Sequence, residues 1–295
     1  MMAYTAKEYE VLFTEPIGEE AIEGLRHKQV ALQKTRTVWA GDMVYVDSYP
    51  VWNTKAEAGK AKKAKEQQRE AQQALNERNR KKYIEQMANA NFTKEDLFAT
   101  FTYAGQAPDE KQALRDMQNL VRRIKSWCAK NGKPAPKYIY VIEFEDTRGK
   151  RKRIHQHMLI SGIDRDALEA LWPHGRANTR RLQPNGYGLA EIVAYMLKAK
   201  RSTRRCTCSR NLTKPKGTTS ERRMSKRKVE RLAEGLTGCA GEVFERVYPG
   251  YELVDYEVAR SEYVAGAYIR ARMRRRDGKR DGKEIRNQGE YIRAG

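Results

Sequence analysis

The chain is poor in cysteine, which bears on its redox setting. Only four cysteines occur in 295 residues, too few for a disulfide framework in a chain of this length. Cys206 and Cys208 could bind zinc, but no second pair and no nearby histidine completes a tetrahedral set. We therefore interpret these cysteines as structural and expect a reducing environment.

Long apolar runs and a phosphate-binding loop are also missing. No stretch approaches the roughly 20 apolar residues that span a bilayer, and the N-terminus lacks the basic-then-apolar pattern of a secretion signal. This predicts a cytoplasmic protein without a membrane partner. No GxxxxGK[ST] motif is present, which argues against an ATP-driven motor.

Acidic residues are outnumbered by basic ones. Lys and Arg total 59 against 38 Asp and Glu, a formal net charge of +21. A polyanion is the simplest partner for a chain with this much positive charge, and nucleic acid is favoured over a membrane surface. A charge surplus that serves only solubility is the alternative interpretation.

Composition and periodicity divide the chain into three regions. Residues 1–90 combine β-rich segments with a long basic helix, which is either an arm near DNA or a linker. Residues 91–215 alternate strands and helices in the order β-α-β-β-α-β-α-β. This order is typical of an α+β domain of ferredoxin-like or RNA-recognition-like type, in which helices cover an antiparallel sheet. Residues 216–295 form a basic extension, with a helix predicted over roughly 220–235 and partial disorder expected over 271–295.

A pair of histidines lies in a strand-like run of the middle region. Side chains of a strand alternate between faces, so His155 and His157 share one face and can chelate a divalent ion. Glu143, on the strand predicted to form a hairpin with this one, supplies a carboxylate, and Glu145 is the second choice. Two imidazoles and one carboxylate leave coordination positions open for water and a phosphate oxygen. Mg²⁺ or Mn²⁺ suits nuclease chemistry, and the sequence does not exclude Zn²⁺. The alternative interpretation is a histidine pair on a solvated strand face that binds no metal.

Tyr195 and Lys198 are three residues apart on a predicted helix and so share one face. A free phenol has a pKa of about 10 and is a poor nucleophile at neutral pH. A metal ion and the Lys198 ammonium nearby would favour the phenolate or neutralise an attacked phosphate. An ordinary half-buried tyrosine and a surface lysine are the alternatives.

These motifs together resemble a known family. Residues 96–212 are similar to the nuclease domain of the HUH endonucleases, in particular the rolling-circle replication initiators and replication-associated proteins of plasmids, single-stranded DNA phages and bacterial mobile elements. The resemblance is carried by a Phe/Thr strand at 98–103, His-x-His at 155–157 and Tyr-x-x-Lys at 195–198, in that order. The middle position of the second motif is usually apolar in that family, and here it is Gln156, which we expect to face away from the metal.

The resemblance implies a site-specific nickase and strand transferase. Tyr195 would become esterified to the 5′-phosphate of a single-stranded origin and leave a free 3′-hydroxyl, with Lys198 beside it and a metal held by His155, His157 and Glu143. A host helicase and polymerase in a bacterial cytoplasm would be partners. No second tyrosine lies four residues away on the helix, so we predict a single-tyrosine enzyme.

Two alternatives remain at the level of sequence. A non-catalytic nucleic-acid-binding protein with an RNA-recognition-like sheet explains the charge and the aromatic residues but not the grouping of the polar motifs. A single-tyrosine HUH transposase would use the same chemistry as a replication initiator. Only the long flanking regions favour the initiator.

Overall fold

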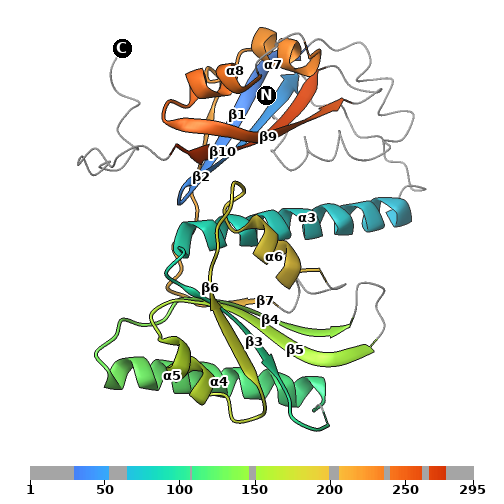
Figure 1. Ribbon diagram of the computed structural model, residues 1–295. Helices are drawn as coiled ribbons and strands as arrows, with labels where there is room; N and C mark the ends of the chain where they lie inside the picture. The colour runs from blue at the N-terminus through green and yellow to red at the C-terminus, as the bar shows by residue number, and fades with distance from the viewer. Residues whose placement is uncertain are drawn as a thin grey trace.

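Two antiparallel sheets and a long helix between them organise the molecule, as a computed structural model shows (Figure 1). The structure describes residues 30–52, 65–106, 108–145, 151–198, 206–235, 240–260 and 266–276. In Figure 1 the layers run from α7 (Lys226–Ala233) and α8 (Ala240–Val247) at the top to α4 (Glu110–Lys130) and α5 (Arg165–Ala170) at the bottom. Between them lie the sheet built from the two flanking regions, called the first sheet, then α3 (Lys65–Asn91), then the sheet of the middle region, called the second sheet.

The middle region forms a five-stranded sheet of order β6-β3-β5-β4-β7. Its strands are β3 (Leu97–Thr102), β4 (Tyr138–Glu145), β5 (Arg151–Ile160), β6 (Ala177–Arg181) and β7 (Cys206–Cys208). Its helices are α4 (Glu110–Lys130), α5 (Arg165–Ala170) and α6 (Ala190–Met196). The first four strands alternate with helices as β-α-β-β-α-β, and each pairs antiparallel with its neighbours. The predicted α+β class, an antiparallel sheet covered by helices, is confirmed.

Helices pack on both faces of this sheet and create two cores. On one face lies α4, whose N-terminus is capped by the Asp109 carboxylate accepting from the Gln112 amide at 2.7 Å. Its apolar stripe, which includes Met117, Leu120 and Ile124, is buried against that face. The opposite face takes α6 and the C-terminal half of α3 (Lys65–Asn91). Side chains on the second face of the sheet can therefore be positioned by α3 and α6.

Gln156 faces the α4 side of the sheet, as expected, and is fully buried there. The amide lies close to the Tyr103 hydroxyl, which donates to Asp116 Oδ2 at 2.9 Å, but it does not meet hydrogen-bond geometry with that hydroxyl. Neither polar atom of the Gln156 side chain has a hydrogen-bond partner among the described residues. Burying an unpaired amide costs free energy.

Gln156→Leu should therefore raise the free energy of unfolding by about 1 kcal/mol, because the change removes a buried amide without a partner. Chemical denaturation measures this, with Gln118→Leu at an exposed position of α4 as the matched control. We expect the control to change stability by no more than about 0.5 kcal/mol. A loss of stability at position 156 would show that the amide is paired in solution.

The two flanking regions share the other sheet, whose order is β8-β1-β2-β10-β9. Its strands are β1 (Val30–Ala40), β2 (Met43–Trp52), β8 (Gly217–Ser220), β9 (Tyr251–Arg260) and β10 (Ala267–Arg275). The helices α7 (Lys226–Ala233) and α8 (Ala240–Val247) cover one of its faces. The strands of this sheet thus come from before and after the middle region in the sequence.

The helix predicted over roughly 220–235 is present, but it begins at Lys226, since residues 217–220 form an edge strand on β1. The partial disorder expected over 271–295 is wrong for residues 271–275, which belong to β10 and pair with both β2 and β9. Residues 277–295 lie outside the described part of the chain, as do residues 1–29. No helix of the described ranges is long and apolar enough to cross a membrane.

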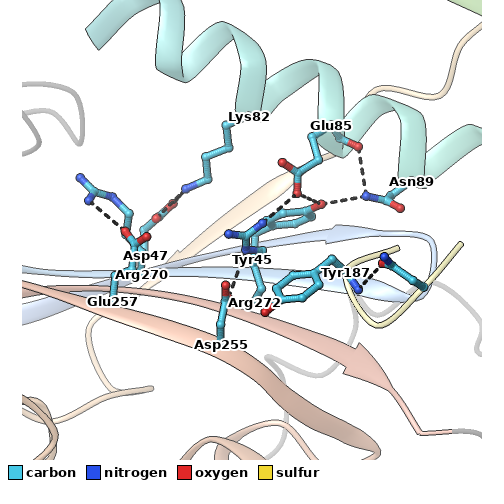
Figure 2. Close-up of polar contacts among 11 residues, drawn as sticks. Tyr45, Asp47, Lys82, Glu85, Asn89, Tyr187, Asp255, Glu257, Arg270 and Arg272 are labelled. Atoms are coloured by element: carbon cyan, nitrogen blue, oxygen red, sulfur yellow. Dashed lines mark hydrogen bonds and ion pairs between the residues drawn. The ribbon is translucent and has the colours of Figure 1, made fainter. Parts of the chain in front are cut away.

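A polar network joins α3 to the first sheet (Figure 2). Tyr45 donates to Glu85 Oε1 at 2.9 Å, and Arg272 contacts both Asp255 at 3.1 Å and Glu85 at 3.7 Å. Burial, more than any other cause, raises the pKa of both the Tyr45 phenol and the Glu85 carboxyl. These contacts fix α3 against β2 and β10, so the long helix is a packed connector between the two sheets.

Candidate active site

The candidate site lies on the face of the middle sheet that α3 and α6 cover. Strand register places Glu143 opposite His155 across the β4–β5 hairpin, with Thr100 opposite His157 on the other side. The His157 Nε2 and Glu143 Oε2 atoms are 3.3 Å apart, and both side chains are at most 3% exposed. The predicted hairpin and the shared face are confirmed.

His157 is held in place by two residues of β3. Thr100 Oγ1 lies 3.1 Å from His157 Nδ1. The hydroxyl can accept a hydrogen bond from the Nδ1–H group, which leaves Nε2 directed at Glu143. The Phe98 ring stacks on the imidazole at a centroid distance of 5.7 Å. We did not predict a role for Thr100 from the sequence, although the Phe/Thr alternation of β3 contained the signal.

Tyr195 reaches this site from α6. Lys198 was predicted on the same helix, which is wrong, because α6 ends at Met196 and Lys198 follows it. The Tyr195 side chain is 45% exposed, and its ring centroid lies 5.1 Å from that of His157. Lys198 Nζ is 3.9 Å from the Tyr195 ring centroid and 3.9 Å from Glu143 Oε1. The lysine therefore connects the exposed phenol with the buried carboxylate.

An open cleft of about 460 Å³ lies beside the phenol. Tyr195 forms one wall, and Arg176, Asn178 and Arg180 line it from β6 and the residue just before that strand. The Arg180 guanidinium carbon is 5.2 Å from the centroid of the Phe98 ring. Among the described residues that line the cleft none is acidic, so the cleft suits an anionic ligand. Sequence reasoning missed these three residues.

The donor types at the site fit a divalent cation. Two neighbouring ligands of an octahedral ion with bonds of about 2.1 Å are roughly 3 Å apart, close to the 3.3 Å between His157 Nε2 and Glu143 Oε2. Within the described ranges, however, no three His, Cys, Asp or Glu side chains are arranged as they stand to hold a metal ion. The Glu145 side chain, the second choice for the carboxylate, lies outside the described part of the structure. The metal ligands thus remain predictions.

The start of α6 is fixed by Asn89 of α3. Asn89 Oδ1 accepts from the backbone amide of Leu189, the residue that caps α6, at 2.9 Å. Its Nδ2 donates to the Tyr45 hydroxyl, also at 2.9 Å. Gly188 has a φ of +64°, and a Cβ there would lie 2.4 Å from Asn89 Oδ1. Glycine is therefore needed for this close approach, which ties the tyrosine-bearing helix to both sheets.

Asn89→Ala should lower the free energy of unfolding by about 2–3 kcal/mol, because it leaves the buried Leu189 amide without a partner and removes the hydrogen bond that the Tyr45 hydroxyl accepts. Thermal and chemical denaturation measure the loss. Asn79→Ala, earlier on the same helix and only half-buried, is the matched control and should cost much less. Equal losses in the two variants would contradict the proposed anchoring of α6.

The fold and the site thus define an α+β domain of ferredoxin-like topology with a basic cleft beside an exposed tyrosine. Residues 96–200 of this domain match the family model of replication-associated protein ORF2. All five predicted site residues lie within the matched range, and the match supports a role in DNA replication of the replication-initiator type. No curated protein and no solved structure matches the chain.

Proposed function

We propose that this protein nicks single-stranded DNA at a replication origin by transesterification. The observation that carries the proposal is the position of Tyr195. Its exposed phenol lies beside His157, and Lys198 connects it to Glu143. A half-buried tyrosine packed only against apolar side chains would have no such neighbours. The similarity of residues 96–200 to a replication-associated family supports the same function.

In the proposed reaction, the Tyr195 oxygen attacks a backbone phosphorus of the DNA. The phenol loses its proton to solvent, a bond forms between Tyr195 Oη and phosphorus, and the bond to the 3′-oxygen breaks. The 3′-oxygen takes up a proton and becomes a free 3′-hydroxyl. One phosphodiester is exchanged for another, so rejoining by the reverse reaction needs no ATP. Lys198 is placed to neutralise charge on the attacked phosphate.

His155, His157 and Glu143 would hold a divalent cation, Mg²⁺ or Mn²⁺. When bound, such an ion supplies positive charge that polarises the phosphate and stabilises the transition state. Thr100 orients His157 through its Nδ1 contact, as residues behind metal ligands commonly do. The buried position of His157 and Glu143 keeps both side chains fixed before substrate arrives.

The cleft beside Tyr195 would receive the strand that is cut. Arg176 and Arg180 can pair with phosphates, and the Asn178 amide can donate to phosphate or base. Because a duplex presents no free strand to such a cleft, we propose a single-stranded or melted origin as the substrate. Host helicase and polymerase would then act on the nicked strand.

The test is incubation of the full chain with single-stranded oligonucleotides from candidate origins and Mn²⁺. We expect cleavage at one position and a protein–DNA adduct that survives denaturation. A non-catalytic nucleic-acid-binding protein would bind the same oligonucleotides without forming either product. Binding without any cleavage, across the origins of the replicon that encodes the chain, would contradict the proposal.

A further inference from the structure

A second basic cleft lies at the other edge of the same sheet face. It has a volume of about 480 Å³ and is formed by α3, β7 and the segment that follows β7. In the part of the chain that the structure describes, its lining includes the cations of Arg80, Arg210 and Lys214 and no acidic residue. All three are exposed. The charge of the lining matches an anionic ligand that reaches the protein from solvent.

The wall of this cleft is fixed from two sides. Ser209 exchanges two hydrogen bonds with the backbone of Tyr138 on β4, at 2.9 and 3.0 Å. Asn91, at the end of α3, exchanges two hydrogen bonds with the Thr213 backbone, at 2.8 and 2.7 Å. The segment that carries Arg210 and Lys214 is therefore held before any ligand binds, which lowers the entropic cost of binding.

An aromatic ring stands among these cations. The Tyr83 side chain is 42% exposed, next to a floor made by the buried side chains of Ile84 and Met87. An exposed aromatic ring flanked by cations is the combination on which single-stranded nucleic acids bind, with a base stacked on the ring and phosphates on the cations. A duplex keeps its bases stacked on each other and cannot use the ring in this way.

The cleft continues the face that carries the candidate active site. Cys206 of β7 is the register partner of Val141 on β4, two residues before Glu143 on the same face. Diagonal neighbours on adjacent strands are about 7–8 Å apart. The second cleft is therefore close to the candidate active site. Because Val141 and Glu143 are themselves buried, a strand that flanks the cut would pass between the two clefts over the outer surface.

We propose that the cleft around Tyr83, Arg80, Arg210 and Lys214 binds the single strand that flanks the cut. The proposal rests on the proposed function for the identity of the strand as DNA. It assigns to α3 and to the segment after β7 a binding role outside the nucleophile and metal ligands. The phosphates contact the three cations, and one base stacks on Tyr83.

Cys208 of β7 provides a direct reporter of this cleft. Cys206 and Cys208 are free, partly buried and part of its lining. The hydrogen bond that the Cys206 thiol donates to Cys208 lowers the pKa of Cys208, and the same hydrogen bond, together with burial, raises the pKa of Cys206. Alkylation of Cys208 by neutral iodoacetamide therefore reads the occupancy of the cleft, while Cys206 and the buried Cys128 should react far more slowly.

The footprint is measured on the full chain with Tyr195→Phe, so that the strand stays intact. A single-stranded thymidine homopolymer should slow alkylation of Cys208 several-fold, read by mass on its peptide. A duplex should protect far less. Unchanged alkylation under saturating single strand, or equal protection by the duplex, would overturn the proposal. Either result would leave adduct formation at Tyr195, measured separately, untouched.

Charge-reversal variants give a second test of the proposed binding cleft. Arg80→Glu/Arg210→Glu should weaken single-strand binding at least about 10-fold and lower the slope of log Kd against log salt by about 1.4, since each lost phosphate contact removes about 0.7. Tyr83→Ala should weaken it about 5-fold or more. Lys111→Glu/Arg115→Glu, exposed on α4 across the sheet, is the control of equal charge. Equal weakening of binding by the control would overturn the proposal. Protection of Cys208 from alkylation without any covalent adduct at Tyr195 would support this cleft and refute nicking.

Discussion

Tyr195→Phe is expected to abolish the covalent protein–DNA adduct while single-strand binding changes by no more than about 2-fold. Only the hydroxyl is lost, and the ring can keep its contacts with His157, Phe98 and Lys198. A phenyl ring has no oxygen that can attack phosphorus. The adduct is measured on a denaturing gel with an oligonucleotide labelled at its 3′ end, because that end stays joined to the protein.

Tyr187→Phe is the matched control for this experiment. Tyr187 is also exposed and lies just before α6, but its ring is next to Arg272 of the first sheet rather than His157. The control should form the adduct at the normal rate. If Tyr195→Phe still forms the adduct, or if Tyr187→Phe loses it, the nucleophile has been assigned to the wrong residue.

His155→Ala and His157→Ala are each expected to lower the nicking rate on the order of 100-fold or more, the usual effect of removing a group that stabilises transition-state charge. Chelation of the wild-type chain by EDTA should have the same effect, and Mn²⁺ should restore it. DNA binding should persist in all cases, because the cations of the clefts are untouched. Single-turnover cleavage of an origin oligonucleotide measures the rate.

A binding measurement separates metal loss from misfolding. Calorimetric titration of wild type with Mn²⁺ should show one site, which both histidine variants lose. His174→Ala is the control, because His174 lies near Asp116 and Trp172, away from Glu143. Its nicking and its Mn²⁺ site should be unchanged. Full nicking by wild type in excess EDTA would rule out a metal role.

The middle region could be predicted from the sequence because its signals are local. The period-two pattern of β4 and β5 puts Glu143 and the two histidines on one face, and a short turn joins the strands. The helix that carries Tyr195 follows from spacing alone, but it ends at Met196, so Lys198 lies just beyond it. How close the phenol comes to His157 is a tertiary property, and the resemblance to a known family supplied that expectation.

The first sheet could not be predicted, because β1 and β2 pair with strands more than 160 residues later in the chain. No local sequence pattern indicates a pairing between strands so far apart in the chain. In β10, arginines at 270, 272 and 274 alternate with buried Ile269, Ala271 and Met273. We read the arginine content as a sign of little structure. The acidic residues of β9 pair with these arginines, at 3.1 Å for Arg272 and Asp255, and so allow the strand to form.

The cleft residues were missed for a related reason. Arg176 and Arg180 matter because β6 lies beside β3 at the edge of the sheet, and strand order is not visible in composition. Arg80 and Arg210 are 130 residues apart and meet only because α3 packs over β7. Charge alone predicted a polyanion partner but not where it would bind.

The most direct test of the central claim is the mass of the peptide that contains Tyr195, after incubation with a cleavable single strand and Mn²⁺ and digestion by protease and nuclease. The account predicts that this peptide carries one nucleotide joined through its 5′-phosphate. An unmodified Tyr195 peptide in a sample where the strand has been cut, or a nucleotide on any other residue, would contradict it.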